Sequence, residues 1–78
     1  MNHDLIVIDP NILNGTPVFA GTRVPVSILF DHLESGISLE EFLDDYPTVE
    51  RSQAVRILEA ANKLITSRNF KELYEIAS

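Results

Sequence analysis

The stretch from residue 14 to residue 27 constrains the fold most strongly, because it holds two of the three glycines and two of the four prolines of the chain. It opens with the turn dipeptide Asn14-Gly15, and Gly21 separates its two short apolar runs. Neither proline of the stretch can donate a backbone hydrogen bond, so neither fits the middle of a fully paired strand. The pattern predicts a bent β-arm that ends at Ser27, which we expect to cap the helix that follows.

A second apolar run precedes this arm and reads Leu-Ile-Val-Ile from residue 5, before Asp9-Pro10 stops it. The run is apolar at every position, so both faces of the predicted strand need cover. Two interpretations stay open: an inner strand of a small sheet, or a strand covered by a second copy of the chain. The second interpretation makes the apolar residues of the arm the dimerisation candidates: Leu5, Ile6, Val7, Ile8, Val18 and Phe19.

Apolar residues at helical spacing predict a first helix from about residue 25 or 27 to residue 35, ended by Gly36 as a left-handed C-terminal cap. Ser38 and Glu41 stand at capping-box spacing, and Pro47 ends this second helix. A third helix is expected from residues 48–50 to about residue 66. The same spacing predicts a further amphipathic helix near the C-terminus, with its apolar face at Phe70, Leu73, Tyr74 and Ala77.

These elements predict one mainly α domain over residues 1–78 with a short N-terminal β-arm. The arm covers residues 1–26, a helix-turn-helix (homeodomain-like) three-helix core covers 27–66, and a C-terminal helical extension covers 67–78. A 78-residue chain forms a marginal core by itself, and domains of this size usually need a disulfide, a metal or a partner. The chain has no cysteine, and His3 and His32 lack ligand spacing, so we expect no metal, no cofactor and a homo-oligomer.

The net charge of −6 is unevenly placed. Arg23 is the only lysine or arginine before Arg51, whereas eight acidic residues precede residue 48. An acidic chain favours a basic protein partner over the phosphate backbone of DNA as the main contact. No signal peptide and no apolar run of membrane-spanning length is present, so a cytoplasmic protein is expected.

Three segments together resemble one known family: Asp-Pro-x-Ile-x-x-Gly-x-Pro-Val from residue 9, Gly-Thr-Arg-Val-Pro-Val-Ser from residue 21, and Gly-Ile-Ser-x-Glu-Glu-Phe-Leu-x-Asp-Tyr-Pro from residue 36. They resemble the bacterial and archaeal domain of unknown function 433, regarded as antitoxins of type II toxin–antitoxin pairs. The resemblance covers about residues 5–62. It implies a winged-helix-like or homeodomain-like module, a homodimer and a PIN-like nuclease toxin as partner. The sequence departs from the family pattern at Thr16, where lysine is usual, and at Glu50, where threonine or serine often caps the third helix.

Three function classes can be weighed on these residues. An enzyme is disfavoured, since the sequence shows no nucleophile motif, no phosphate-binding glycine loop and no paired carboxylate–histidine arrangement at a cleft. The favoured hypothesis is an antitoxin that neutralises a PIN-like ribonuclease and, with it, binds operator DNA. Its toxin-binding candidates are acidic residues at the end of the second helix and apolar residues near the C-terminus: Asp44, Asp45, Phe70, Leu73 and Tyr74.

The alternative hypothesis is a stand-alone helix-turn-helix transcriptional regulator. It would read DNA with polar and basic residues at the start of the third helix and on the arm: Arg51, Ser52, Gln53, Arg56 and Arg23. For Arg23 the favoured interpretation is a structural one, a tie between the bent arm and a helix end or an acidic residue such as Asp9. His32, beside the apolar stripe of the first helix, is expected at the rim of the core rather than as a catalytic base.

Overall fold

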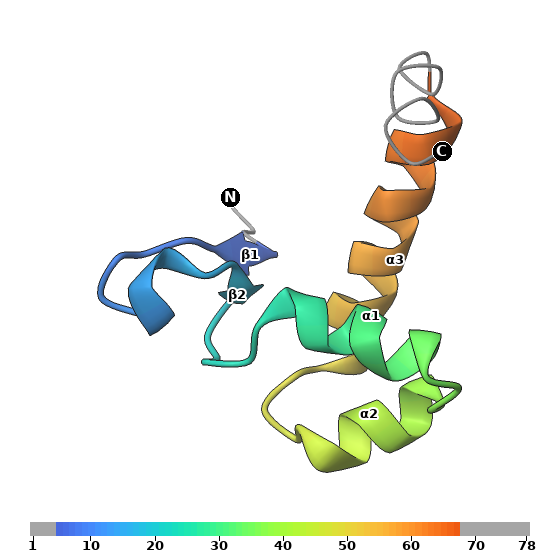
Figure 1. Cartoon of the computed structure of the whole chain (residues 1–78), viewed down its shortest axis with the longest axis horizontal. Coiled ribbons are helices and arrows are strands. Elements are labelled where there is room, and N and C mark those ends of the chain that lie inside the picture. Colours follow the sequence, from blue (N-terminus) through green and yellow to red (C-terminus); the bar gives the residue numbers. More distant parts are fainter. Residues whose placement is uncertain (1–4, 68–78) are drawn as a thin grey trace.

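The computed structural model describes residues 5–67, which form three helices and a short two-stranded antiparallel sheet (Figure 1). Strands β1 (Ile6–Val7) and β2 (Val18–Phe19) flank a short 3-10 helix, η1 (Leu13–Gly15). Helices α1 (Val26–Glu34), α2 (Leu39–Asp45) and α3 (Arg51–Thr66) follow. The predicted mainly α fold with an N-terminal β-arm is confirmed at this level. The predicted C-terminal helix with Phe70, Leu73 and Tyr74 lies outside the described residues.

The β-arm folds back on itself within the chain. Ile6 pairs with Phe19 and Val7 with Val18 in the sheet. The next turn is closed by the Phe19 amide, which donates to the Val24 carbonyl at 3.0 Å, while Gly21 adopts a left-handed φ of +77°. A second short pairing joins Val18 to Pro25, so β2 has neighbours on both sides. The arm therefore delivers the chain directly into α1.

Helix α1 begins two positions earlier than a cap at Ser27 would allow. Its N-cap residue is Pro25, without a side-chain cap, and Ser27 lies inside the first turn. The prediction of a Ser27 cap is therefore wrong: the Val26 amide already donates to the Pro17 carbonyl of the arm, which sets the start of the helix. The other end follows the prediction. Gly36 has φ +82°, and the Ile37 amide donates back to the His32 carbonyl at 2.8 Å, which closes a Schellman cap.

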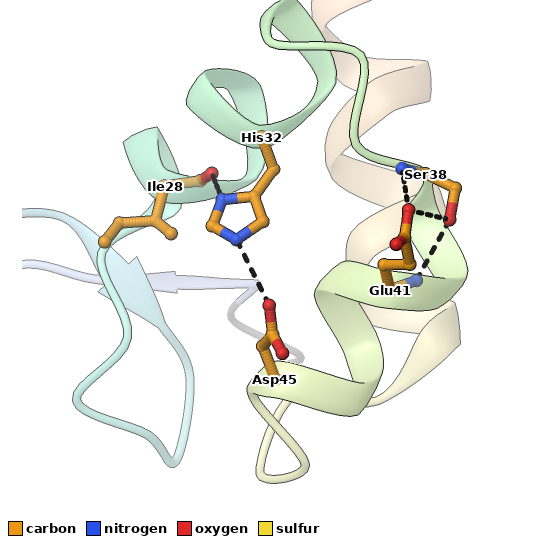
Figure 2. Close-up of polar contacts among 5 residues, drawn as sticks. All are labelled: Ile28, His32, Ser38, Glu41 and Asp45. Carbon is orange, nitrogen blue, oxygen red and sulfur yellow. Dashed lines mark hydrogen bonds and ion pairs between the residues drawn. The ribbon is translucent and has the colours of Figure 1, made fainter.

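The predicted capping box of α2 is confirmed. The Glu41 amide donates to Ser38 Oγ, and the Ser38 amide donates to Glu41 Oε1, both at 3.1 Å (Figure 2). The helix ends at Asp45 with Tyr46 as its C-cap, directly before Pro47. Local sequence thus sets both ends of α2.

The hydrophobic core joins the arm to all three helices. Its fully buried side chains include Phe19 from β2, Leu29 from α1 and Phe42 from α2, and the Phe19 and Phe42 ring centroids are 6.1 Å apart. Helix α3 contributes only its first half to this core, through Ala54 and Ile57. Its second half rises away from the other helices (Figure 1), and Leu64 and Ile65 are 55% and 53% exposed.

Candidate functional site

The start of α3, which would read DNA in a helix-turn-helix protein, is held by contacts within the chain. Arg51, the first residue of α3, forms an ion pair with Glu40 of α2, and both side chains are more than half exposed. This ion pair ties α3 to α2 across the loop between them. Arg51 is therefore not a free cation.

Both polar atoms of the Gln53 side-chain amide form hydrogen bonds within the chain. Its Nε2 donates to the Ala20 carbonyl of the arm at 3.0 Å, and its Oε1 accepts from the Glu50 amide at 2.9 Å. The second bond caps the start of α3, and the first anchors the β-arm to this helix. The sequence alone made Gln53 a DNA-binding candidate. The Glu50-x-x-Gln53 spacing, typical of a capping box, was the signal for this structural role.

The remaining DNA-binding candidates stay available to a partner. Ser52 and Arg56 are exposed on α3, and within residues 5–67 neither side chain makes a hydrogen bond or ion pair. Arg23 is exposed on the turn after β2 and has no ion pair in the described part of the chain, so the proposed tie to Asp9 is not formed there.

Arg23 stands at an open groove of about 550 Å³ between the arm and the loop that precedes α3. Val7, Ile12 and Val24 supply aliphatic groups to its walls, and Thr22 and Thr48 supply hydroxyls. The Thr22 hydroxyl is engaged, since it donates to the Phe19 carbonyl and accepts from the Val24 amide. Arg23 is the only charged residue in this lining.

At the acidic end of α2, one carboxylate lies close to a histidine and the other does not. His32 Nδ1 faces the Ile28 carbonyl at 2.9 Å and donates to it, while His32 Nε2 lies 3.6 Å from Asp45 Oδ2 (Figure 2). The imidazole also packs edge-on against the Phe42 and Tyr46 rings, with centroids 5.5 and 5.6 Å away. His32 thus lies at the rim of the core, between α1 and α2. Asp44 is exposed and, within residues 5–67, has no such partner.

The dimerisation candidates divide into two groups. Val18 and Phe19 are completely buried in the chain's own core, so their side chains leave no surface for a second copy. By contrast, Ile6 of β1 and Ile8, which directly follows the strand, are 41% and 67% exposed. The arm therefore presents its apolar surface at β1 and not at β2.

Neither a metal centre nor a membrane span emerges from the described residues. Among residues 5–67, no three histidine or acidic side chains gather closely enough to hold a metal ion. No helix in that range combines the length and apolar character needed to cross a bilayer.

The sequence matches the family described as protein of unknown function DUF433 over residues 6–60, which covers both the arm and the core of the fold. The chain belongs to the DUF433 family. This DUF433 chain is also similar to the uncharacterized protein y4eO of Sinorhizobium fredii (strain NBRC 101917 / NGR234), with 36% identity over 63 residues. That match covers 78% of the chain but only 28% of the relative's length. No solved structure matches the chain.

Proposed function

We propose that this DUF433 protein is an antitoxin. As a homodimer it binds and neutralises a PIN-like ribonuclease toxin, and together with that toxin it binds operator DNA. The role rests on the family resemblance. The charged side chains on the surface of the chain favour a protein over DNA as the first partner.

The observation that favours a protein partner over DNA is that side chains at the start of α3 are already bound within the chain. A helix that reads DNA needs free side chains near its N-terminus to reach base edges. Here Arg51 is paired with Glu40, and Gln53 is bonded to the arm and to the Glu50 amide. Glu50 itself places a carboxylate at this end, which phosphate would repel. Of the predicted DNA-binding residues, Ser52, Arg56 and Arg23 remain, and two cations are too few for tight independent binding.

The acidic surface supports the toxin as the first partner. An RNA-cutting toxin needs a basic surface to bind its substrate, and an acidic protein can cover that surface. Asp31, Glu34 and Asp44 are exposed on α1 and α2 and have no ion pair within residues 5–67. Asp31 and Glu34 extend the acidic toxin-binding candidates beyond Asp44 and Asp45, and Asp45 Oδ2 lies 3.6 Å from His32 Nε2.

A helix-turn-helix role for α2 and α3 fits the order of the helices. Helix α2 is short and closely capped, and the loop of residues 46–50 leads from it into the longer α3. In this proposal α3 contacts operator DNA only when the toxin supplies further positive charge. The stand-alone regulator is the second candidate, favoured by the exposed Arg56 and Ser52.

Two experiments separate these functions. The antitoxin proposal predicts that the tagged protein captures the product of the adjacent gene when the two are co-expressed. Recovery of no toxin-like partner would overturn it. The regulator alternative predicts tight binding of the isolated protein to its own upstream DNA near physiological salt, whereas the antitoxin proposal predicts weak binding that falls steeply as salt rises.

A further inference from the structure

The outer face of β1 is an unusual place for apolar side chains. Exposure alternates along β1 and the residue on either side of it: Leu5 packs against the core and Val7 lines the groove, whereas Ile6 and Ile8 face away from the body of the chain. Ile8 is 67% exposed, the highest value among the large apolar residues that the structure describes as exposed. Two isoleucines two residues apart thus share one uncovered face.

The backbone of β1 also has a second edge, with which no strand of residues 5–67 pairs. The Ala20 amide donates to the Leu5 carbonyl, and Val7 pairs with Val18. In an antiparallel ladder the peptide groups of successive residues point to opposite sides. Leu5 and Val7 therefore direct their N–H and C=O groups toward β2, and Ile6 and Ile8 direct theirs toward the other edge. That edge carries no charge or proline between residues 5 and 8, the usual protections of an exposed edge strand.

We propose that β1 pairs antiparallel with β1 of a second copy, with Val7 opposite Val7 on a two-fold axis. This register sets each Ile6 opposite the other copy's Ile8, as hydrogen-bonded pairs, so all four isoleucines meet on one face. A shift by two residues would instead put Pro10 or Asp4 opposite an isoleucine. The symmetry of Ile6 and Ile8 about Val7 is what selects a second copy as the occupant, since a two-fold interface must be self-complementary.

The pairing also enlarges a very small sheet. Each of its two strands is only two residues long, so few backbone hydrogen bonds hold β1 to β2 within one chain. Joining two arms at β1 produces one four-stranded sheet in the order β2-β1-β1-β2. This inference rests on the homodimer of the proposed function and specifies where its two copies meet.

Single cysteines test the register directly, because the chain has none of its own. In a non-hydrogen-bonded pair the two Cα atoms are about 4.5 Å apart, within disulfide range, so the full chain carrying Val7→Cys should form a covalent dimer with oxidised glutathione. Ile6→Cys is the matched control. Its two copies would lie diagonally at about 7–8 Å, and the disulfide should not form efficiently.

Sedimentation of uncrosslinked variants completes the test. Wild type should sediment near twice 8.8 kDa. Ile8→Glu should weaken the dimer by about 100-fold, because two isoleucines per dimer lose their apolar partners. Ile65→Glu, at a similarly exposed site on α3, should leave the dimer unchanged.

Two results would overturn this interface and still leave the homodimer standing. One is a dimeric protein in which Val7→Cys forms no crosslink. The other is a dimer that is broken by Ile65→Glu but not by Ile8→Glu. A monomeric wild type would overturn both, whereas capture of the toxin tests the antitoxin role separately.

Discussion

The bond between Gln53 and the arm makes a strong prediction about what this side chain does. Gln53→Ala removes two hydrogen bonds, to the Ala20 carbonyl and from the Glu50 amide. Each is worth about 0.5–1.5 kcal/mol net, and water replaces the exposed bond at Glu50 more readily than the part-buried bond at Ala20. We expect the free energy of unfolding to fall by about 1–2 kcal/mol, and each kcal/mol lowers the melting temperature by roughly 4–8 °C in a domain of this size.

Urea unfolding followed by circular dichroism at 222 nm measures this change. Ser52→Ala is the matched control, because Ser52 is the exposed neighbour in the same turn, and its effect should stay within about 0.5 kcal/mol. Gln53→Glu separates the two bonds. It keeps the acceptor for Glu50 but sets a carboxylate against the Ala20 carbonyl, so hydrogen exchange of the Phe19 and Ala20 amides should accelerate more than that of α3. An unchanged stability for Gln53→Ala would refute this reasoning and return Gln53 to the DNA-binding candidates.

Three further predictions concern the core and the helix ends. Phe42→Ala removes a fully buried ring from the core and should cost about 3–5 kcal/mol, enough to lose the helical signal of so small a domain at 37 °C. Ser38→Ala breaks the capping box of α2 and should cost about 1 kcal/mol in urea unfolding, with Ser52→Ala again as the control. A double-mutant cycle on Glu40 and Arg51 should give a coupling energy below about 1 kcal/mol that shrinks as salt is raised, because both side chains are exposed.

The helix ends were predictable because short-range chemistry decides them. Ser38 and Glu41 are three residues apart, Gly36 tolerates a left-handed φ, and Pro47 cannot continue a helix. Each of these signals acts through the local backbone. The start of α1 was not predictable in the same way, since the Pro17 carbonyl that receives its first amide comes from the arm.

The surfaces were harder to predict, because tertiary contacts decide which polar and apolar side chains are free. Helical periodicity places Ile57 and Leu64 on one stripe, but the body of the chain covers only the first half of α3. Likewise, Gln53 has the residue type of a DNA reader, yet its partner Ala20 is 33 residues away along the chain. In the sequence, Val18 and Phe19 look the same as interface residues, because only the folded arm shows that both side chains are buried in the chain's own core.

The most direct test of the antitoxin proposal is the ribonuclease activity of the adjacent gene's product, measured while this protein is titrated into the assay. The proposal predicts that activity falls to near zero and that inhibition saturates at a fixed stoichiometry of the two proteins. A nuclease that this protein does not inhibit, or an adjacent product that cuts no RNA, would contradict the proposal.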